Sequence, residues 1–377
     1  MRLGDLVNAN HTIASSLSFQ CKTFAQKRSR LTHVITRAEV ARRNKNERHN
    51  DGRCDMTHII AVLSALPRLS YHLRSRLPNL CVSDVLPGQA DTLTKLNAAE
   101  ILVADCDLLI PYANKLTSVK WIQATWAGLD NFIPHVQAAQ RNYILTRFSD
   151  ESFGLAMSEY VIAQIVNFER DQRRQYENQK LSVWTNDGKV TNHRRIHDLT
   201  IGILGLGTIG KFIARNLKIF GTTVWGMTRS VPNEELPYLD EHRTVEKLSD
   251  ILENCDYIIN VLPSTPNTVG LLNGNVLQRC KDKDTVFINI GRGSVIRESD
   301  LINALEQKWI SGAILDVFEE EPLPKESKLW SFPQVTISPH VSGISRTEDI
   351  AKLFATNYAK YVKGENLLNV FDFDKGY

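Results

Sequence analysis

The sequence lacks the long apolar runs, paired cysteines and strong net charge that mark several classes of protein. No apolar run reaches the roughly 18 to 20 residues that a membrane-spanning helix needs, so we expect no membrane anchor. The six cysteines are scattered without a C-x-x-C pair, which argues against a disulfide framework or a zinc ribbon. That cysteine usage favours a reducing compartment, and we expect a cytoplasmic protein. A net charge of +3 is too small to indicate a nucleic-acid partner.

The composition is that of a globular protein, and the chain is long enough for two domains. The chain has 377 residues, of which 42% are apolar and 23% charged. Residues 1–55 carry eleven Lys or Arg against five Asp or Glu, whereas the rest of the chain carries 34 and 37. Because this first segment shows no helical or strand period, we interpret it as a poorly ordered basic extension. A mitochondrial transit segment is the alternative.

From Met56 onward, short apolar runs alternate with polar helical stretches. We predict strands at residues 59–66, 80–85, 107–111, 120–124, 200–204, 223–227, 257–262, 285–290, 312–315 and 335–338. Long helices are expected at residues 155–184 and 346–362. The alternation predicts an α/β protein with two Rossmann-like, doubly wound parallel-sheet domains and a cleft between them. We expect a substrate domain at residues 56–150 plus 341–377, and a dinucleotide-binding domain at residues 151–340.

A glycine-rich turn follows the predicted strand at residues 200–204 and opens a helical run. It has the G-x-G-x-x-G spacing of dinucleotide sites and reads Gly205-Leu206-Gly207-Thr208-Ile209-Gly210. Gly205 permits the tight turn, Gly207 leaves room for a pyrophosphate, and Gly210 lets the helix pack against the strand. The phosphates would bind at the helix N-terminus, at Thr208 and Ile209, where unpaired N–H groups attract anions. Phe212 stands where a nucleoside-triphosphatase loop needs Ser or Thr, so we reject that interpretation.

The end of the next strand decides between the two nicotinamide cofactors. NAD sites usually carry an acid there, which accepts hydrogen bonds from the ribose 2′-OH, but no carboxylate occurs between Val224 and Pro232. Thr228, Arg229 and Ser230 occupy the position instead. An arginine can pair with a 2′-phosphate, and the two hydroxyls can donate to it. We therefore expect NADP(H) to be preferred, with NAD(H) as the alternative.

Three polar residues follow later apolar strands directly. They are Arg292 in NIGRG, Glu321 in LDVFEEEP and His340 in SPHVSG. In a doubly wound sheet, ligands bind beyond the carboxyl ends of the strands. There an arginine can clamp a carboxylate, a histidine can donate the proton that accompanies a hydride, and a glutamate can fix the imidazole tautomer. The set is what carbonyl reduction requires, although Arg292 alone could cap a turn and His340 alone could be an ordinary turn histidine.

The four ordered motifs, GLGTIG, NIGRG, LDVFEEEP and SPHVSG, resemble those of the D-isomer-specific 2-hydroxyacid dehydrogenases over about residues 56–377. The resemblance implies that Arg292 binds substrate, that Glu321 is the imidazole partner and that His340 is the proton donor. By the same resemblance Asp316 faces the nicotinamide amide. Further matches imply that the amides of Ala127 and Gly128, in WIQATWAGLD, hold the substrate carboxylate, and that Leu262 and Pro263, in VLP, contact the cofactor.

The implied activity is hydride transfer from NADPH to a small 2-oxo acid, giving a D-2-hydroxy acid. A glyoxylate/hydroxypyruvate reductase is the first interpretation, and a broader 2-oxoacid reductase is the second. The family and the long, polar-ended helix suggest a homodimer. An NAD(H)-responsive co-repressor on the same fold is the alternative from another class, but it should carry an acid where Thr228 stands. His193 and His197 have metal-pair spacing, yet they lie in a polar stretch, so we expect no metal site.

Overall fold

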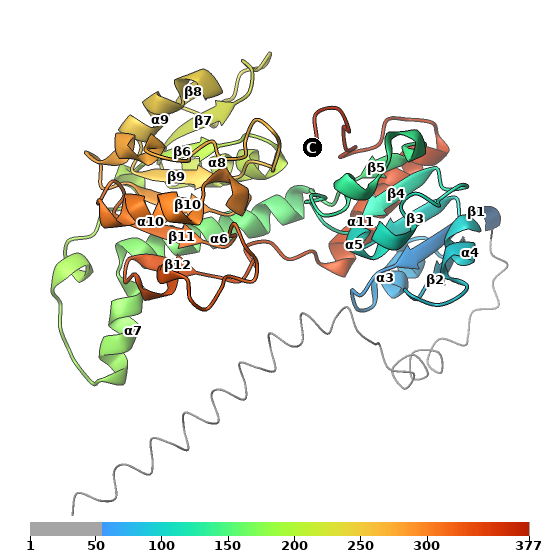
Figure 1. Cartoon of the computed structure of the whole chain (residues 1–377), viewed down its shortest axis with the longest axis horizontal. Coiled ribbons are helices and arrows are strands. Elements are labelled where there is room, and N and C mark those ends of the chain that lie inside the picture. Colours follow the sequence, from blue (N-terminus) through green and yellow to red (C-terminus); the bar gives the residue numbers. More distant parts are fainter. Residues whose placement is uncertain (1–54, 377) are drawn as a thin grey trace, which may run out of the picture. The chain divides into compact units, whose positions relative to one another are not determined.

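Two parallel β-sheets with helices on their faces make up the described part of the chain (Figure 1). The computed structural model describes residues 55–376, and the chain from Thr57 onward forms one unit. The predicted N-terminal extension, and with it the transit alternative, lies outside the described residues except for its last position. The two sheets confirm the predicted fold class.

The first sheet has five strands in the order β2-β1-β3-β4-β5. Its strands are β1 (Asp55–Leu63), β2 (Leu80–Asp84), β3 (Ile101–Ala104), β4 (Trp121–Ala124) and β5 (Ile144–Thr146). Its helices are α3 (Leu69–Arg76), α4 (Thr92–Asn97), α5 (Cys106–Leu109) and the C-terminal α11 (Thr347–Val362). Side chains alternate between the two faces, so that Ile60 packs under α3 and α11 while Ala61 faces the other core. Trp121 stacks on Phe354 of α11 at 5.0 Å between ring centres, which joins the C-terminal helix to this sheet.

The second sheet has seven strands in the order β12-β11-β10-β9-β6-β7-β8, the doubly wound order with one strand added at its edge. Its strands are β6 (Thr200–Leu204), β7 (Thr223–Thr228), β8 (Glu241–Thr244), β9 (Tyr257–Asn260), β10 (Val286–Asn289), β11 (Gly312–Leu315) and β12 (Val335–Ile337). Helices α6 (Glu151–Glu169), α8 (Thr208–Ile219), α9 (Leu248–Asn254) and α10 (Glu298–Glu306) cover it. The strand order reverses between β6 and β9, so the carboxyl ends of these two strands mark the expected ligand crevice.

Two predicted elements are wrong. Residues 107–111 form no strand, because the chain turns into α5 and a short 3-10 helix (Ile110–Tyr112), and the buried strand lies just before them at β3. The single helix predicted at residues 155–184 is broken into α6 and α7 (Gln172–Lys180). Asp171, between them, has φ of 49°, a left-handed conformation that ends the first helix.

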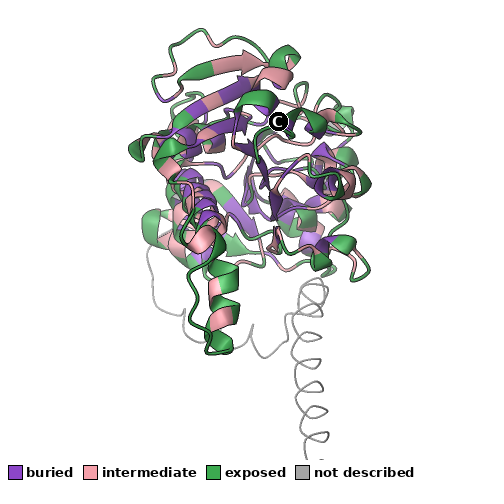
Figure 2. Ribbon diagram, turned by 90° about the vertical axis from the view of Figure 1, so that its left-hand side faces the viewer, coloured by how far each residue is buried: buried purple, intermediate pink, exposed green. Residues whose placement is uncertain are grey.

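Helix α7 buries none of its residues, unlike α6, and the segment that follows it is equally exposed (Figure 2). Its apolar side chains point away from either core, with Leu181 72% and Trp184 fully exposed. The second half of the predicted helix is therefore polar because it is exposed to solvent. A few large apolar residues interrupt this polar stretch.

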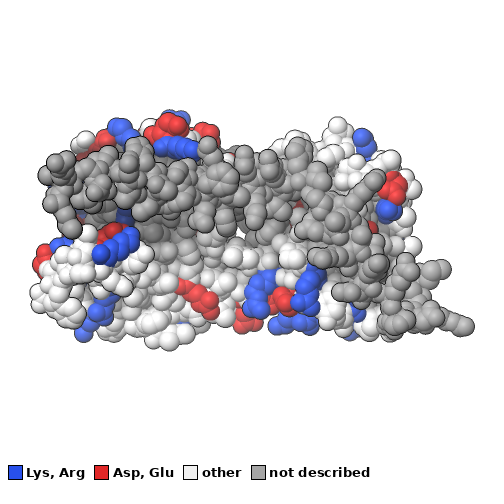
Figure 3. All heavy atoms as spheres, turned by 90° about the horizontal axis from the view of Figure 1, so that it is seen from below, with Lys and Arg blue, Asp and Glu red and all other residues white. Residues whose placement is uncertain are grey.

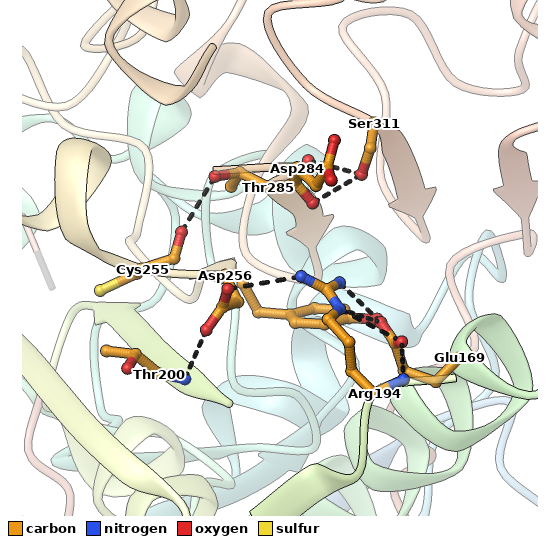
Figure 4. A network of polar contacts seen from close by, with 9 residues as sticks. Glu169, Arg194, Thr200, Cys255, Asp256, Asp284, Thr285 and Ser311 are labelled. Atoms are coloured by element: carbon orange, nitrogen blue, oxygen red, sulfur yellow. Dashed lines mark hydrogen bonds and ion pairs between the residues drawn. The ribbon is translucent and has the colours of Figure 1, made fainter. Parts of the chain in front are cut away.

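A charged network lies at the amino ends of several strands of the seven-stranded sheet (Figure 4). Buried Glu169, at the end of α6, accepts hydrogen bonds from Arg194 (2.7 Å) and from the Tyr257 hydroxyl (2.6 Å). Asp256 contacts Arg194 at 3.4 Å and accepts from the Thr200 amide at 2.7 Å. Burial raises the pKa of Glu169, but its bonds to Arg194 and Tyr257 outweigh burial and hold the pKa below its usual range. The network ties α6 to the starts of β6 and β9.

On the face drawn in Figure 3, several of the visible Lys and Arg side chains lie beside Asp and Glu side chains. Such mixing agrees with the small net charge of the sequence. Within residues 55–376, no helix combines the length and the apolar character that crossing a bilayer demands.

Candidate active site

The glycine-rich turn has the geometry of an anion cradle. Gly205 has φ of 104°, a conformation that other residues rarely adopt, and a Cβ on Gly210 would collide with the Gly205 carbonyl. Gly207 is the N-cap of α8, no side chain caps this helix, and a Cβ at Gly207 would meet no atom within 4 Å. The helix N-terminus, with Thr208 and Ile209 in its first turn, thus opens onto free space where a pyrophosphate would fit.

The turn at the end of β7 carries the residues predicted to select the cofactor. Arg229 and Ser230 are exposed, and Thr228 is half-buried. The Thr228 hydroxyl lies 2.6 Å from the Ser230 carbonyl oxygen and 2.7 Å from Nε2 of His242. Thr228 therefore contacts its own turn and strand β8, and its hydroxyl is already engaged.

Leu262 and Pro263 follow β9 at the point where the strand order reverses. A Cβ on Gly205 would touch the Leu262 side chain at 3.1 Å, and one on Gly291 would approach the Leu262 carbonyl at 2.8 Å. Leu262 thus lies between the glycine turn and the loop that carries Arg292. Pro263 lines the cavity described next.

Arg292 and the loop after β4 line the same cavity, which has a volume of about 340 Å³. Its lining includes Ala127, Gly128, Asp130, Arg147, Pro263, Arg292 and Phe371. The Arg292 guanidinium contacts Asp130 at 2.7 Å and also donates to the Gly291 carbonyl at 2.7 Å. A Cβ on Gly128 would collide with this guanidinium, so only glycine allows the close approach. The residues predicted to bind substrate therefore meet around one cavity.

The loop that carries Ala127 and Gly128 is anchored at its start. Buried Asp105 accepts hydrogen bonds from the Thr125 hydroxyl (2.6 Å), the Ser64 hydroxyl (2.7 Å) and a backbone amide. Burial raises the pKa of Asp105, and these hydrogen bonds offset only part of that effect. The amides of Ala127 and Gly128 donate to no other group within residues 55–376. Two N–H groups on a fixed loop are thus available to an anion in the cavity.

Glu321 and His340 form a second pair. Nδ1 of His340 lies 2.8 Å from the Glu321 carboxylate, and the Phe318 amide donates to the same carboxylate at 3.0 Å. Burial raises the pKa of Glu321, but the hydrogen bonds and the positive charges of His340 and Arg292 outweigh it and lower the pKa overall. An ionised carboxylate only accepts, so Nδ1 carries the hydrogen and Nε2 faces away from the pair. The Glu321 carboxylate thus holds the ring of His340 in one orientation.

Asp316, which the resemblance assigns to the nicotinamide amide, contacts the turn that carries His340. The side chain is fully buried, and its carboxylate accepts from the Ser338 hydroxyl (2.6 Å) and from the amides of Val341 and Ser342 (2.8 Å each). These contacts hold the turn that carries His340, whose φ of 54° is unusual for a residue with a side chain. Asp316 therefore shapes the turn and presents no surface to the cavity.

Three residues of the site escaped sequence reasoning. Asp130 pairs with Arg292, Arg147 lines the cavity, and Asp105 anchors the loop. Asp105 directly follows a buried strand, a position that could have drawn attention to it. Asp130 is the last residue of the WIQATWAGLD segment, but its pairing with Arg292 depends on a contact between segments far apart in the chain, and Arg147 gave no signal.

Of the two histidines considered as metal ligands, His197 is engaged elsewhere. Nδ1 of His197 lies 3.3 Å from the Phe220 carbonyl oxygen, and its ring packs against Gly221. No cluster of three or more His, Cys, Asp or Glu suited to a metal occurs among residues 55–376.

Comparison with known proteins places the chain in a family. Residues 162–342 match the family model "D-isomer specific 2-hydroxyacid dehydrogenase, NAD binding domain". A family protein from Aeromonas salmonicida is 32% identical, with 84% of this chain and 99% of that chain covered and a TM-score of 0.73. The NADPH-dependent glyoxylate/hydroxypyruvate reductase of Sinorhizobium meliloti, solved with NADP and sulfate, is 28% identical over 85% of this chain and 100% of its own, with a TM-score of 0.72.

A further relative from Xanthobacter autotrophicus, solved with NADPH and MES, is 26% identical over 85% of this chain and 99% of its own, with a TM-score of 0.73. The family model spans the glycine turn and the loops that carry Arg292, Glu321 and His340. The chain therefore belongs to the D-isomer-specific 2-hydroxyacid dehydrogenase family of NAD(P)-dependent oxidoreductases.

Proposed function

We propose that this protein reduces small 2-oxo acids to D-2-hydroxy acids at the expense of NADPH, with glyoxylate and hydroxypyruvate as its preferred class of substrate. The observation that carries the proposal is the approach of Arg292 to Gly128 on one cavity, which supplies a carboxylate binder, and the pairing of His340 with Glu321 supplies a proton donor. The similarity to the Sinorhizobium reductase, which is NADPH-dependent by name, supports the choice of substrate.

Substrate binding would use charge and backbone donors together. Arg292 would clamp the carboxylate of the 2-oxo acid, and the free amides of Ala127 and Gly128 would donate to the same group. Arg292 now pairs with Asp130, so the substrate must take over at least one of its guanidinium bonds. Fixing the carboxylate in this way orients the neighbouring carbonyl in the cavity.

Proton transfer would fall to His340. Its Nδ1–H donates to Glu321, which fixes the tautomer and leaves Nε2 to protonate the carbonyl oxygen. The buried Asp316 holds the turn that presents the ring. Glu321 stabilises the positive charge that the imidazole carries before it gives up its proton.

The cofactor would bind at the carboxyl ends of β6, β7 and β9. Gly205, Gly207 and Gly210 with the first turn of α8, at Thr208 and Ile209, would hold the pyrophosphate, and Leu262 and Pro263 would line its path. Arg229 and Ser230 would bind a ribose 2′-phosphate, in keeping with the NADP or NADPH bound in three similar structures. When bound, the reduced nicotinamide supplies the hydride to the carbonyl carbon.

Steady-state kinetics with both cofactors tests the proposal. Oxidation of NADPH should be faster than oxidation of NADH with glyoxylate or hydroxypyruvate, and the product should be the D acid. Replacing Arg229 by Asp should weaken NADPH binding far more than NADH binding, because a carboxylate repels the 2′-phosphate. Absence of turnover with every small 2-oxo acid would refute the activity.

We also propose a homodimer and the domain division at residues 56–150 plus 341–377 and 151–340. Support for the dimer comes from exposed Leu181 and Trp184 beside α7, because a second copy that covered these large apolar side chains would remove their surface from water, which is favourable. Light scattering should give twice the mass of one chain. The double substitution Leu181→Glu and Trp184→Glu should yield monomers, and an unchanged mass would exclude this surface.

A further inference from the structure

The turn of Thr228, Arg229 and Ser230 is held by a residue outside it. This turn is the part of the protein that distinguishes NADPH from NADH in the function proposed above. Two of its residues are exposed at the edge of the seven-stranded sheet, so their positions depend on what fixes the turn. The Thr228 hydroxyl bonds both within the turn, at the Ser230 carbonyl oxygen, and to His242 of the neighbouring strand β8.

The direction of these two hydrogen bonds follows from counting hydrogens. The Ser230 carbonyl oxygen, 2.6 Å from Thr228 Oγ1, can only accept, and a threonine hydroxyl has one hydrogen to give. Thr228 therefore donates to Ser230. Nε2 of His242, at 2.7 Å from the same oxygen, must then be the donor of the second bond. His242 is in the Nε2–H tautomer and its hydrogen holds Thr228 in place.

The surroundings of His242 favour this neutral, donating form. The residue lies on β8, opposite Gly226 of β7 in the register of the parallel pair, and is half-buried. Burial lowers its pKa, and the charge of neighbouring Arg243 lowers it further. Arg243 itself is kept in place over Trp225 and by Asp250 at 2.9 Å. A neutral imidazole has a single N–H, so the one it has is committed to Thr228.

We infer that His242 is a positioning residue for NADPH: by donating to Thr228 it holds the turn in the conformation that presents Arg229 and Ser230 to the 2′-phosphate. The inference rests on the proposed use of NADPH. It also changes the expected role of Thr228, whose only hydrogen is already given to Ser230 and which therefore orders the turn. NADH has no 2′-phosphate, so loss of His242 should affect it little.

Binding of NADP⁺ and NAD⁺ to the purified protein, measured by calorimetry, tests the inference without any substrate. His242→Leu should raise the Kd for NADP⁺ about three- to tenfold, the range expected for one hydrogen bond, and leave the Kd for NAD⁺ within about twofold. His242→Gln keeps an N–H donor and should recover most of the NADP⁺ affinity. His197→Leu, which removes an exposed imidazole at the other end of the same sheet, is the matched control and should change neither Kd.

Coupling to Thr228 gives a second, independent criterion. Thr228→Val removes the shared oxygen, so the double variant Thr228→Val/His242→Leu should bind NADP⁺ no more weakly than Thr228→Val alone. Equal weakening of NADP⁺ and NAD⁺, unchanged NADP⁺ binding in His242→Leu, or full additivity in the double variant would each overturn the inference. A wild-type protein that prefers NADP⁺ but reduces no 2-oxo acid would refute the proposed activity and leave this binding test valid.

Discussion

The two ends of the seven-stranded sheet carry the same kinds of residues and use them differently. At the amino ends, Glu169, Arg194 and Tyr257 saturate one another in a buried network (Figure 4). At the carboxyl ends, Arg292 and His340 each have one acidic partner, and Nε2 of His340 has no hydrogen-bond partner within residues 55–376. The two clusters therefore differ in how many of their polar groups already have hydrogen-bond partners. Their residue types alone would not distinguish the structural cluster from the functional one.

The largest expected effect of any substitution is at His340. Replacing it by Ala should lower kcat about 10²- to 10⁴-fold, the usual contribution of a general acid, while the melting temperature and NADPH binding stay close to wild type. Stopped-flow reduction and calorimetry would measure the two properties. His135→Ala, an exposed histidine on a loop of the other sheet, is the control. A rate retained in His340→Ala would remove the residue from the role of proton donor.

Substitutions in the network of Glu169, Arg194 and Tyr257 should lower stability and leave catalysis unchanged. Arg194→Met leaves the buried Glu169 carboxylate without its cation, and we expect about 3 kcal/mol less free energy of unfolding, with kcat/KM unchanged. Chemical denaturation measures this value. The neighbouring Arg195 pairs with Asp198 on the surface and is 72% exposed, so Arg195→Met should cost under about 1 kcal/mol. If Arg194→Met impaired catalysis without loss of stability, the contrast between the two ends would be wrong.

Arg292 should behave as a substrate clamp. Arg292→Gln is expected to reduce kcat/KM about a hundredfold, chiefly through KM, because an amide cannot replace a doubly hydrogen-bonded cation. Gly128→Ala should reproduce much of the loss, since the new Cβ would displace the same guanidinium. The exposed neighbour Arg297 provides the control, and Arg297→Gln should be neutral. Unaltered KM in both test variants would contradict the assignment.

Glu321→Gln should have the smallest of these effects, about tenfold in kcat, as expected for a hydrogen bond to a charged group. The pKa of Glu321 is lowered in the folded protein, so its ionised form stabilises the fold above its unfolded pKa of about 4.3, and this contribution is lost as pH falls through the folded value. The stability difference from wild type should therefore be constant near neutral pH and shrink below about pH 4. The exposed Glu320→Gln is the control, and an identical pH dependence in it would exclude Glu321 as the cause.

The sequence was sufficient where function depends on a short motif at a strand end. Arg292, Glu321 and His340 each follow a buried strand of the same parallel sheet, and parallel strands deliver their carboxyl ends to one edge. The glycine turn was predictable for the same reason, because its spacing reflects a local backbone requirement at Gly205 and Gly210. Local pattern and sheet topology together thus predicted that these loops lie at one edge of the sheet.

Contacts between residues far apart in the chain could not be predicted from the sequence. The pairing of Asp130 with Arg292 spans 162 positions of the chain, and the donation of His242 to Thr228 crosses between strands, one of which, β8, is too polar to be recognised as a strand. Burial of Asp316 depends on how the following turn folds back. The break between α6 and α7 depends on a left-handed Asp171 that neither composition nor apolar period indicates.

Isotope transfer tests the central claim most directly. The protein is incubated with hydroxypyruvate and NADPH that carries deuterium at the transferable position of nicotinamide C4, and the product is analysed by mass spectrometry and chiral chromatography. We predict D-glycerate with one deuterium on C2 and much slower labelling with deuterated NADH. Unlabelled product, the L acid, or no product would contradict the account.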